Sequence, residues 1–268
     1  MLRGVEGTEG VRGVLRPDGA AGRFTLARHP SAGDLAPFID YYWIVRWDLG
    51  EEPPYEQSIL PHPCVHLVFE PDGASVYGID TKIFTRRLTG QGKVLGVRFR
   101  PGCFRPFSPR AISRLNDTVV PAASLLGRAV ASANEAVMAA GTDEEMISVA
   151  AALLREIRPP RDRVAEQVAA MVERISADLE IRRVGDLTAA FGWPERKLQR
   201  LFSEYVGVSP KWVMRRARLH EAALRATSGE AVDWATLAKD LGYADQSHLT
   251  RDFTATIGTP PARYTASA

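Results

Sequence analysis

Arginine and glutamine side chains are spaced along one side of a short segment near the C-terminus, at about 194–206. Arg196, Gln199 and Arg200 stand at i, i+3 and i+4. On a helix this spacing places the side chains on one face. Arginine can make two hydrogen bonds with guanine, and glutamine two with adenine, at base edges in the major groove of DNA. These residue types fit a helix face that contacts nucleic acid, but a polar face with two arginines is more often simply solvated, so the interpretation depends on the features that follow.

A second segment repeats this pattern at an offset of about 51 residues. Leu198-Gln199-Arg200-Leu201-Phe202 recurs as Leu249-Thr250-Arg251-Asp252-Phe253. The leucine and phenylalanine of each copy form an apolar stripe that predicts burial. The polar side chains that we expect to contact bases in the second copy are Gln246, Ser247, His248, Thr250 and Arg251.

Each copy follows a glycine, Gly192 or Gly242, at the point where a turn between paired helices needs a positive φ. A short helix, a glycine turn and a second helix form the layout of a helix-turn-helix. The sequence thus predicts two such units, over 184–206 and 234–257. Asp245 is the expected N-cap of the second reading helix.

A helix predicted from Pro210 to about Thr227 joins the two units, with Ser209 as N-cap and Pro210 at the first helical position. About 18 residues would span roughly 27 Å. Successive major grooves on one side of DNA lie roughly 34 Å apart. A rigid helix of this length can place the two units in adjacent grooves. The basic residues expected to contact phosphates are Lys197, Lys211, Arg215 and Arg216.

From about Val184 to Tyr264 the chain resembles the DNA-binding domain of the AraC/XylS family of bacterial transcription regulators. The residues that carry the resemblance are Leu198-Gln199-Arg200-Leu201-Phe202, Gly207-Val208-Ser209-Pro210, 241–253 and Gly258-Thr259-Pro260-Pro261-Ala262-Arg263-Tyr264. The resemblance implies two reading helices in the major groove on one face of DNA. Matched to the family pattern, base contacts fall on Arg196, Gln199, Arg200, Gln246, Ser247, His248 and Arg251.

The first unit departs from the family pattern at the start of its second helix. Trp193-Pro194-Glu195 stands where a small polar cap is usual, and the Glu195 carboxylate would repel phosphate. The detailed contacts of the first unit are therefore less well defined by the resemblance than those of the second.

The sequence pattern of the N-terminal half is typical of a mostly-β domain. Apolar runs at 39–45, 65–69 and 94–99 are separated by turn signals such as Pro71-Asp72-Gly73, which predicts a β-barrel or sandwich. Regulators of the resembled family commonly carry an N-terminal sensor, often a cupin-like barrel that binds a small effector. The side chains expected to line an effector pocket are Tyr42, Trp43, His66, Phe69, Arg98 and Phe99. Arg98 would suit an anionic effector or a structural ion pair.

His62, Cys64 and His66 alternate, so on a strand they would share one face. Such a set could bind zinc or copper, although no fourth ligand is visible. The alternative is that the three residues only line the barrel, and we predict no metal and no cofactor. An alkyl-DNA repair enzyme is disfavoured because its zinc site needs four cysteines and the chain has 2. We therefore predict no enzyme. A metal-dependent cupin-like enzyme or sensor fused to a DNA-binding domain, and a protein-interaction module with degenerate units, are the alternatives.

Composition sets the remaining expectations. The chain has 268 residues, 45% of them hydrophobic, and a net charge of +2, so any contact with DNA must depend on where the charges lie. Two cysteines make no disulfide framework, and no apolar stretch approaches ~18 residues or resembles a signal peptide. We therefore expect a cytoplasmic protein without a membrane partner. Its expected partners are promoter or operator DNA, a small-molecule effector, RNA polymerase if it activates, and a second copy in a homodimer.

The predicted organisation is α+β, with two main domains. A loosely ordered segment occupies 1–22, and a β-rich effector-sensing domain occupies 23–121. A helical connector, which could also mediate dimerisation, follows over 122–160 and ends at Pro159-Pro160. The all-α DNA-binding domain occupies 161–268.

Overall fold

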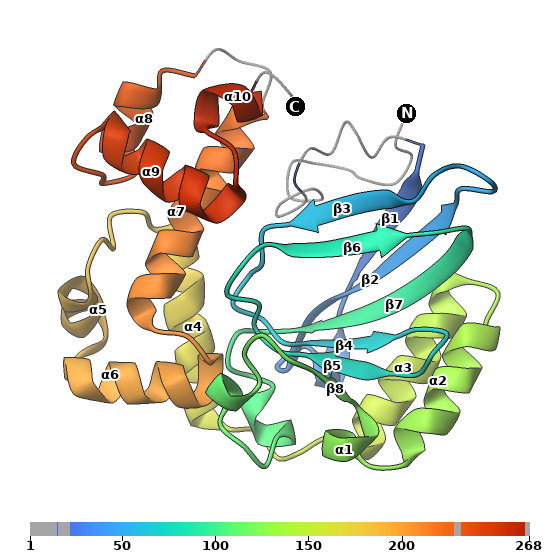
Figure 1. Ribbon diagram of the computed structural model, residues 1–268. Helices are drawn as coiled ribbons and strands as arrows, with labels where there is room; N and C mark the ends of the chain where they lie inside the picture. Colours follow the sequence, from blue (N-terminus) through green and yellow to red (C-terminus); the bar gives the residue numbers. More distant parts are fainter. Residues whose placement is uncertain (1–14, 16–21, 228–231, 266–268) are drawn as a thin grey trace.

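The computed structural model describes residue 15, residues 22–227 and residues 232–265 of the chain. A mostly-β N-terminal part is followed by helices, which confirms the expected α+β organisation (Figure 1). The predicted loose segment 1–22 lies outside the described residues except for Leu15 and Gly22. Leu15 is buried, and its amide donates to the carbonyl of Ser58 at 3.0 Å.

Antiparallel strands of the N-terminal part form two sheets. The larger sheet has the strand order β1-β2-β7-β4-β5-β8, and the smaller one pairs β3 with β6. The strands are β1 (Phe24–Pro30), β2 (Ile39–Asp48), β3 (Tyr55–Ile59), β4 (His66–Phe69), β5 (Ser75–Tyr77), β6 (Phe84–Leu88), β7 (Gln91–Phe99) and β8 (Val119–Pro121). Figure 1 shows β3 and β6 on one side of the larger sheet and the helices α2 and α3 on the other. The larger sheet keeps β1 and β8 as its edges.

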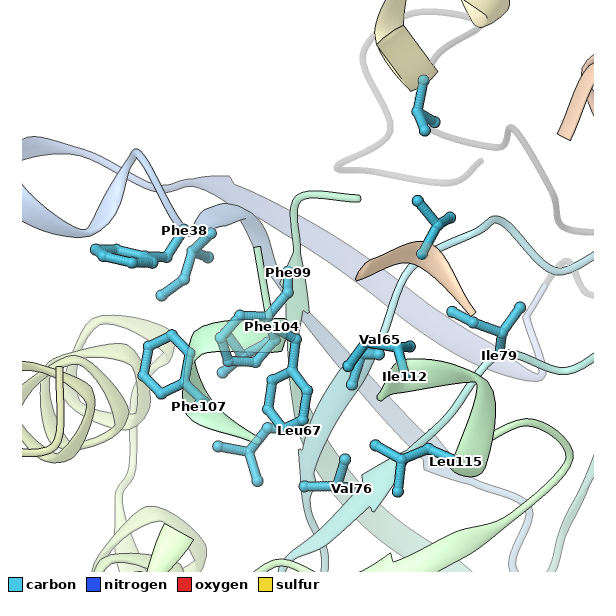
Figure 2. Close-up of a cluster of buried hydrophobic side chains, with 14 of the residues drawn as sticks. Phe38, Val65, Leu67, Val76, Ile79, Phe99, Phe104, Phe107, Ile112 and Leu115 are labelled. Carbon is cyan, nitrogen blue, oxygen red and sulfur yellow. The ribbon is translucent and has the colours of Figure 1, made fainter. Parts of the chain in front are cut away.

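Alternation along the strands divides the larger sheet into two faces. Tyr42, Ile44 and Phe99 belong to the main hydrophobic cluster. Their neighbours Tyr41, Trp43 and Arg98 point to the opposite face, because successive side chains of a strand alternate. Figure 2 shows Phe99 among Phe38, Phe104 and Phe107 in this cluster.

The helices that follow the sheet lie within the predicted helical connector, 122–160. They are α1 (Ala123–Leu126), α2 (Ala129–Ala139) and α3 (Asp143–Glu156). Thr142 is the N-cap of α3. Its hydroxyl accepts from the amide of Glu145 at 3.2 Å, while the Glu145 carboxylate accepts from the amide of Thr142 at 3.1 Å. This reciprocal capping box fixes the start of the helix.

The C-terminal helices confirm the two predicted helix-turn-helix units. After α4 (Arg163–Ala177) come the first unit, the joining helix and the second unit. Their elements are α5 (Val184–Phe191), α6 (Glu195–Leu201), a π-helical turn (Phe202–Val206), α7 (Pro210–Ala226), α8 (Trp234–Asp240), α9 (Gln246–Ile257) and α10 (Pro261–Thr265). Gly192 and Gly242 have φ values of 68° and 73°, as the turns were expected to require.

The hydrophobic core continues through the predicted boundary at Pro159-Pro160. The main cluster includes Phe104 and Ile112 of the N-terminal part together with Val168 of α4 and Phe202 of the first unit. Polar contacts follow the same route, since Arg105 donates to Glu204 at 2.6 Å and the amide of Asn116 donates to the carbonyl of Gly207 at 2.7 Å. The first helix-turn-helix unit is thus packed against the N-terminal part rather than joined to it only by a linker.

Among the described residues, no helix is both long enough and apolar enough to span a bilayer.

Candidate functional site

The second helix of the first unit has one buried and one exposed face. Leu198 and Phe202 are completely buried, which holds the helix in place. The side chains predicted to contact DNA, Arg196, Gln199 and Arg200, are exposed. The structure therefore places the predicted reading face of α6 at the surface.

The unusual start of α6 has structural consequences. Pro194 occupies the N-cap position and provides no side-chain cap. The ammonium of Lys197 lies 3.8 Å from the centre of the Trp193 ring, and the amide of Gln199 donates to Glu195 at 2.9 Å. Two of the predicted DNA-contacting side chains are thus held by neighbours within the first unit, and each would exchange that contact for one with DNA.

The second unit has a conventional N-cap. The Asp245 carboxylate accepts from the amide of His248 at 2.7 Å. Leu249 and Phe253 are fully buried, and the predicted reading side chains at 246–248 and Arg251 are exposed. Thr250 is half-buried. The two units therefore present equivalent faces, with Arg200 and Arg251 at matching places.

The joining helix α7 is tied to the second reading helix by an ion pair. Arg215 of α7 pairs with Asp252 of α9. The same carboxylate accepts a hydrogen bond of 2.8 Å from the hydroxyl of Tyr243. Arg215 is still half-exposed and Lys211 is exposed, so both can lie near phosphates. This network sets the orientation of α9 relative to α7.

Arg216 is not placed to contact phosphate in this structure, contrary to the sequence prediction. It is 4% exposed, its guanidinium lies over the ring of Trp212, and its Nη2 donates to the carbonyl of Thr81 at 2.9 Å. The reason is helical geometry, since a step of one residue turns the side chain by about 100°. Arg215 therefore faces outward while Arg216 faces the N-terminal part. Burial lowers the pKa of Arg216 to about 10.

A cavity of about 210 Å³ lies between the two sheets of the N-terminal part. Of the six side chains predicted to line an effector pocket, Trp43, His66 and Arg98 do so. Tyr42, Phe69 and Phe99 do not line the cavity, because they lie on the other face of the sheet, in the hydrophobic core. Adjacent residues such as Tyr42 and Trp43 cannot share one face of a strand.

The same alternation accounts for lining residues that were not among the predicted ones. Tyr41 and Trp47 are on β2 at even spacing from Trp43, and Arg28 is on the neighbouring strand β1. A strict period of two from Trp43 would have indicated Tyr41 and Trp47. No local signal identifies Arg28.

Two indole rings lie over glycines on the floor of the cavity. Trp43 is paired with Gly96 across β2 and β7, and Trp47 is paired with Gly92. A Cβ atom on Gly96 would lie 1.9 Å from the Trp43 ring, and one on Gly92 would lie 2.3 Å from the Trp47 ring. Both glycines therefore make room for a flat aromatic surface.

The Gly96→Ala substitution should accordingly displace the Trp43 ring and lower the free energy of unfolding by about 1–3 kcal/mol, the usual cost of overpacking. Denaturant unfolding monitored by tryptophan fluorescence would measure this. Gly185→Ala, which has no positive φ and no atom near the added Cβ, is the control for the addition of a methyl group. An unchanged stability for Gly96→Ala would contradict the described packing of Trp43.

The weak metal candidates His62, Cys64 and His66 all line the cavity, but they do not form a metal site. The Nδ1 atom of His66 accepts from the indole of Trp43 at 3.0 Å, and the sulfur of Cys64 accepts from the Nε of Arg98 at 3.2 Å. The ring of His62 is stacked on that of His220. Only His66 lies within β4, so the assumed alternation on one strand does not hold. No group of three potential ligands occurs within residues 22–227 or 232–265.

Loops at the edge of the cavity contact α7 directly. The His62 and His220 rings are stacked with centroids 3.9 Å apart, and the Nε2 of His220 lies 3.3 Å from the carbonyl of Pro61. Both Pro61 and His62 line the cavity. Asp80, which precedes the Thr81 that binds Arg216, also lines it. The helix that joins the two reading units is thus in contact with the cavity wall, an arrangement that no sequence signal indicated.

Comparison with known protein families identifies two segments. Residues 187–267 match the model of a helix-turn-helix domain, and residues 27–121 match a domain of unknown function, DUF6597. No curated protein matches the chain.

Solved structures of ToxT from Vibrio cholerae are similar over most of the chain. One at 1.65 Å resolution is 11% identical, covers 91% of this chain and 98% of that chain, and has a TM-score of 0.42. A ToxT structure bound to (E)-4-(8-methylnaphthalen-1-yl)but-3-enoic acid is 12% identical, with 91% and 98% coverage and a TM-score of 0.40. A ToxT structure with bound unsaturated fatty acid is 12% identical, with 94% and 92% coverage and a TM-score of 0.38.

The family match coincides with the two units that the sequence repeat defined. It begins at Leu187 in α5 and extends beyond α10, so it includes both reading helices and the helix α7 between them. The C-terminal part of the chain, residues 187–267, is therefore a helix-turn-helix domain that contains both units and the helix between them.

Proposed function

We propose that the protein reads two adjacent major grooves of double-stranded DNA with α6 and α9, and that a small molecule in the N-terminal cavity modulates this binding. The observation that carries the DNA proposal is the pair of exposed reading faces with Arg200 and Arg251 at equivalent positions. Arg196, Gln199, Gln246, Ser247, His248, Thr250 and Arg251 would contact bases together with Arg200. Lys197, Lys211 and Arg215 would contact phosphates.

We assign one role to each of the predicted segments. Residues 23–121 would sense the effector, and residues 161–268 would bind DNA in the cytoplasm. The helices of 122–160 would serve as a dimer contact, since α2 and α3 lie on the side of the sheet away from β3 and β6 (Figure 1). If the protein activates transcription, RNA polymerase would be a further partner.

Selection of bound sequences from random DNA by the full chain tests the DNA proposal. We expect enriched sites with two half-sites whose centres are about 10–10.5 base pairs apart, because two reading helices in adjacent grooves require one helical turn. A single short motif without a second half-site would argue against the use of both units. Absence of any enriched sequence would refute the proposal.

The effector would act through α7. The first unit precedes this helix, the second follows it, and Arg215 fixes α9 against it. Cavity-lining loops contact the same helix through His220 and Arg216. A ligand that binds one position of these loops better than another would therefore shift the position of α7 and hence the relative placement of the reading helices.

Burial of Arg216 indicates that the contact restrains α7. Its Nη1 atom is buried and makes no hydrogen bond within the described residues. A buried donor without a partner costs about 1–3 kcal/mol. We therefore infer that the contacts of Arg216 and His220 with the N-terminal part hold α7, and that the unbonded Nη1 lowers the cost of releasing the helix.

The His220→Ala variant tests this inference without any ligand. Loss of the stack with His62 should weaken the restraint and tighten DNA binding about fivefold, the lower end of typical allosteric coupling. Fluorescence anisotropy with a selected DNA site would measure it. Thr227→Ala, a neutral change at the C-terminal end of the same helix, is the matched control. Unchanged or weaker DNA binding by His220→Ala would rule out a restraining role for the contact.

A further inference from the structure

We propose that the ligand of the cavity is a small apolar carboxylate, whose acid group lies at Arg28, Tyr41 and His66 and whose apolar body lies over Trp43 and Trp47. The inference rests on the proposed function in one respect only: it takes the cavity to be the effector site. It adds the chemical class of the effector, which follows from the volume and the lining residues of the cavity.

The size of the cavity limits the ligand. A volume of about 210 Å³ is below the ~300–1,000 Å³ of pockets for drug-sized ligands. The cavity therefore suits a single ring or a short chain with one functional group.

The floor and walls require an apolar body. The indole nitrogen of Trp43 donates to His66 at 3.0 Å, and that of Trp47 donates to the carbonyl of Thr89 at 3.1 Å. Since both N–H groups are already bonded, the rings offer only their flat apolar faces. The walls add apolar side chains of the two sheets, among them Leu26, Val45, Ile59, Val68 and Val94. A sugar or another polyol would leave its hydroxyl groups without partners on such surfaces, which is costly.

One end of the cavity offers hydrogen-bond donors. Tyr41 is central there, because the guanidinium groups of Arg28 and Arg98 lie 5.1 and 5.0 Å from its ring centre. The Tyr41 hydroxyl accepts from Arg98 at 2.8 Å and keeps its own proton for donation. The Nδ1 of His66 accepts from Trp43, so a neutral imidazole carries its proton on Nε2. Arg28 also lines the cavity and adds a positive charge.

The carboxyl groups of the lining are engaged or lie elsewhere. Glu70 pairs with Arg86 at 2.5 Å and accepts from Tyr77 at 2.6 Å. Asp80 belongs to the loop that leads to Thr81 and α7. Asp40, which pairs with Arg98 at 3.4 Å, is not part of the lining. A donor-rich end with a cationic group selects an anionic acceptor, and a carboxylate accepts several such bonds at once.

The electrostatics of His66 support this geometry. Burial and the positive charges of Arg98 and Arg28 lower the pKa of His66 to about 3. The two arginine charges, which add to the effect of burial on His66, would stabilise a carboxylate and disfavour a cationic ligand.

Calorimetric titration of the full chain with ring-matched probes tests the proposal. Benzoate, cyclohexanecarboxylate and hexanoate represent the acids, benzamide the neutral counterpart and benzylamine the cation. We expect at least one acid to bind about tenfold more tightly than benzamide, the order expected of one charge-assisted hydrogen bond. The proposal is overturned if benzamide or benzylamine binds as tightly as the best acid, or if no acid binds at millimolar concentration.

Two variants locate the acid group. Arg28→Gln should weaken binding of the best acid about tenfold and leave benzamide binding unchanged, because the charge is lost and the length is kept. Arg87→Gln, on the exposed side of β6, is the matched control. Tyr41→Phe removes only a hydroxyl and should weaken acid binding severalfold, which keeps the test valid if Arg28→Gln disturbs folding. Full acid affinity in both Arg28→Gln and Tyr41→Phe would contradict the proposed position of the carboxylate.

DNA binding measured with and without the same small-molecule probes separates this inference from the proposed function. Acid binding without any change in DNA affinity would leave the ligand class in place and refute the sensing role. If only a neutral ligand changes the DNA affinity, the sensing role is supported and the proposed ligand class is refuted.

Discussion

The Arg200→Ala/Arg251→Ala double variant is expected to bind the best selected DNA site about 2–6 kcal/mol more weakly than the natural chain, since each base-reading arginine contributes about 1–3 kcal/mol. Both side chains are exposed at equivalent places on α6 and α9. Because they lie on different helices and would read different half-sites, the two losses should add. Folding should be unaffected, as neither side chain belongs to the core.

Fluorescence anisotropy titrations would measure the loss of DNA-binding free energy. Comparing the selected DNA site with sites altered at single base pairs would show which base each arginine contacts. Each single variant should relax base preference at one position, within the half-site of its own helix. Arg128→Ala, an exposed charge change at the start of α2, is the control for net charge. If both single variants bind the selected site as tightly as Arg128→Ala does, the assignment of α6 and α9 as reading helices is wrong.

The sequence predicted best those features whose causes are local. The positive φ of Gly192 and Gly242, the Asp245 cap and the Ser209-Pro210 start of α7 were all expected and are all present. Each depends on a few consecutive residues, so its physical cause is contained in the sequence nearby. The exposed and buried faces of the reading helices followed from helical periodicity for the same reason.

The cavity was predicted only in part because its lining depends on strand parity. The aromatic residues of 39–45 and 94–99 were correctly placed on strands, but Tyr42 and Phe99 were placed in the pocket although they alternate with its true lining. A single-residue shift moves a side chain to the other face of a sheet. Composition alone does not show which face has the core.

The burial of Arg216 depends on contacts between segments far apart in the sequence. Its partner Thr81 lies 135 residues away, and nothing near Arg216 distinguishes it from the exposed Arg215. A basic residue on a joining helix is reasonably assigned to phosphate when only the sequence is known. Packing of the N-terminal part against α7 reverses that assignment for one of two adjacent arginines.

Substitution of the repeated phenylalanines should reveal that the two copies are not equivalent in the folded chain. Phe202 and Phe253 are both completely buried, and truncation of either to alanine should cost about 3–5 kcal/mol of unfolding free energy. Phe202 lies in the cluster that includes the core of the N-terminal part. Phe253 lies in a second cluster, mainly with residues of α7–α10, and contacts the rings of Trp234 and Tyr264.

Hydrogen exchange followed by mass spectrometry would separate the two effects. Phe202→Ala should increase exchange in α4 and in the strands of the larger sheet as well as in the first unit, because these share one core. Phe253→Ala should increase exchange mainly in α8–α10 and remove recognition of one half-site, since its cluster reaches the N-terminal part chiefly through Leu15 and Leu60. Equal exposure of the larger sheet in both variants would show that the second unit is as firmly integrated with the N-terminal part as the first. In that case the effector could not move one reading helix relative to the other without disturbing the whole fold, and regulation through α7 would have to act on both units together.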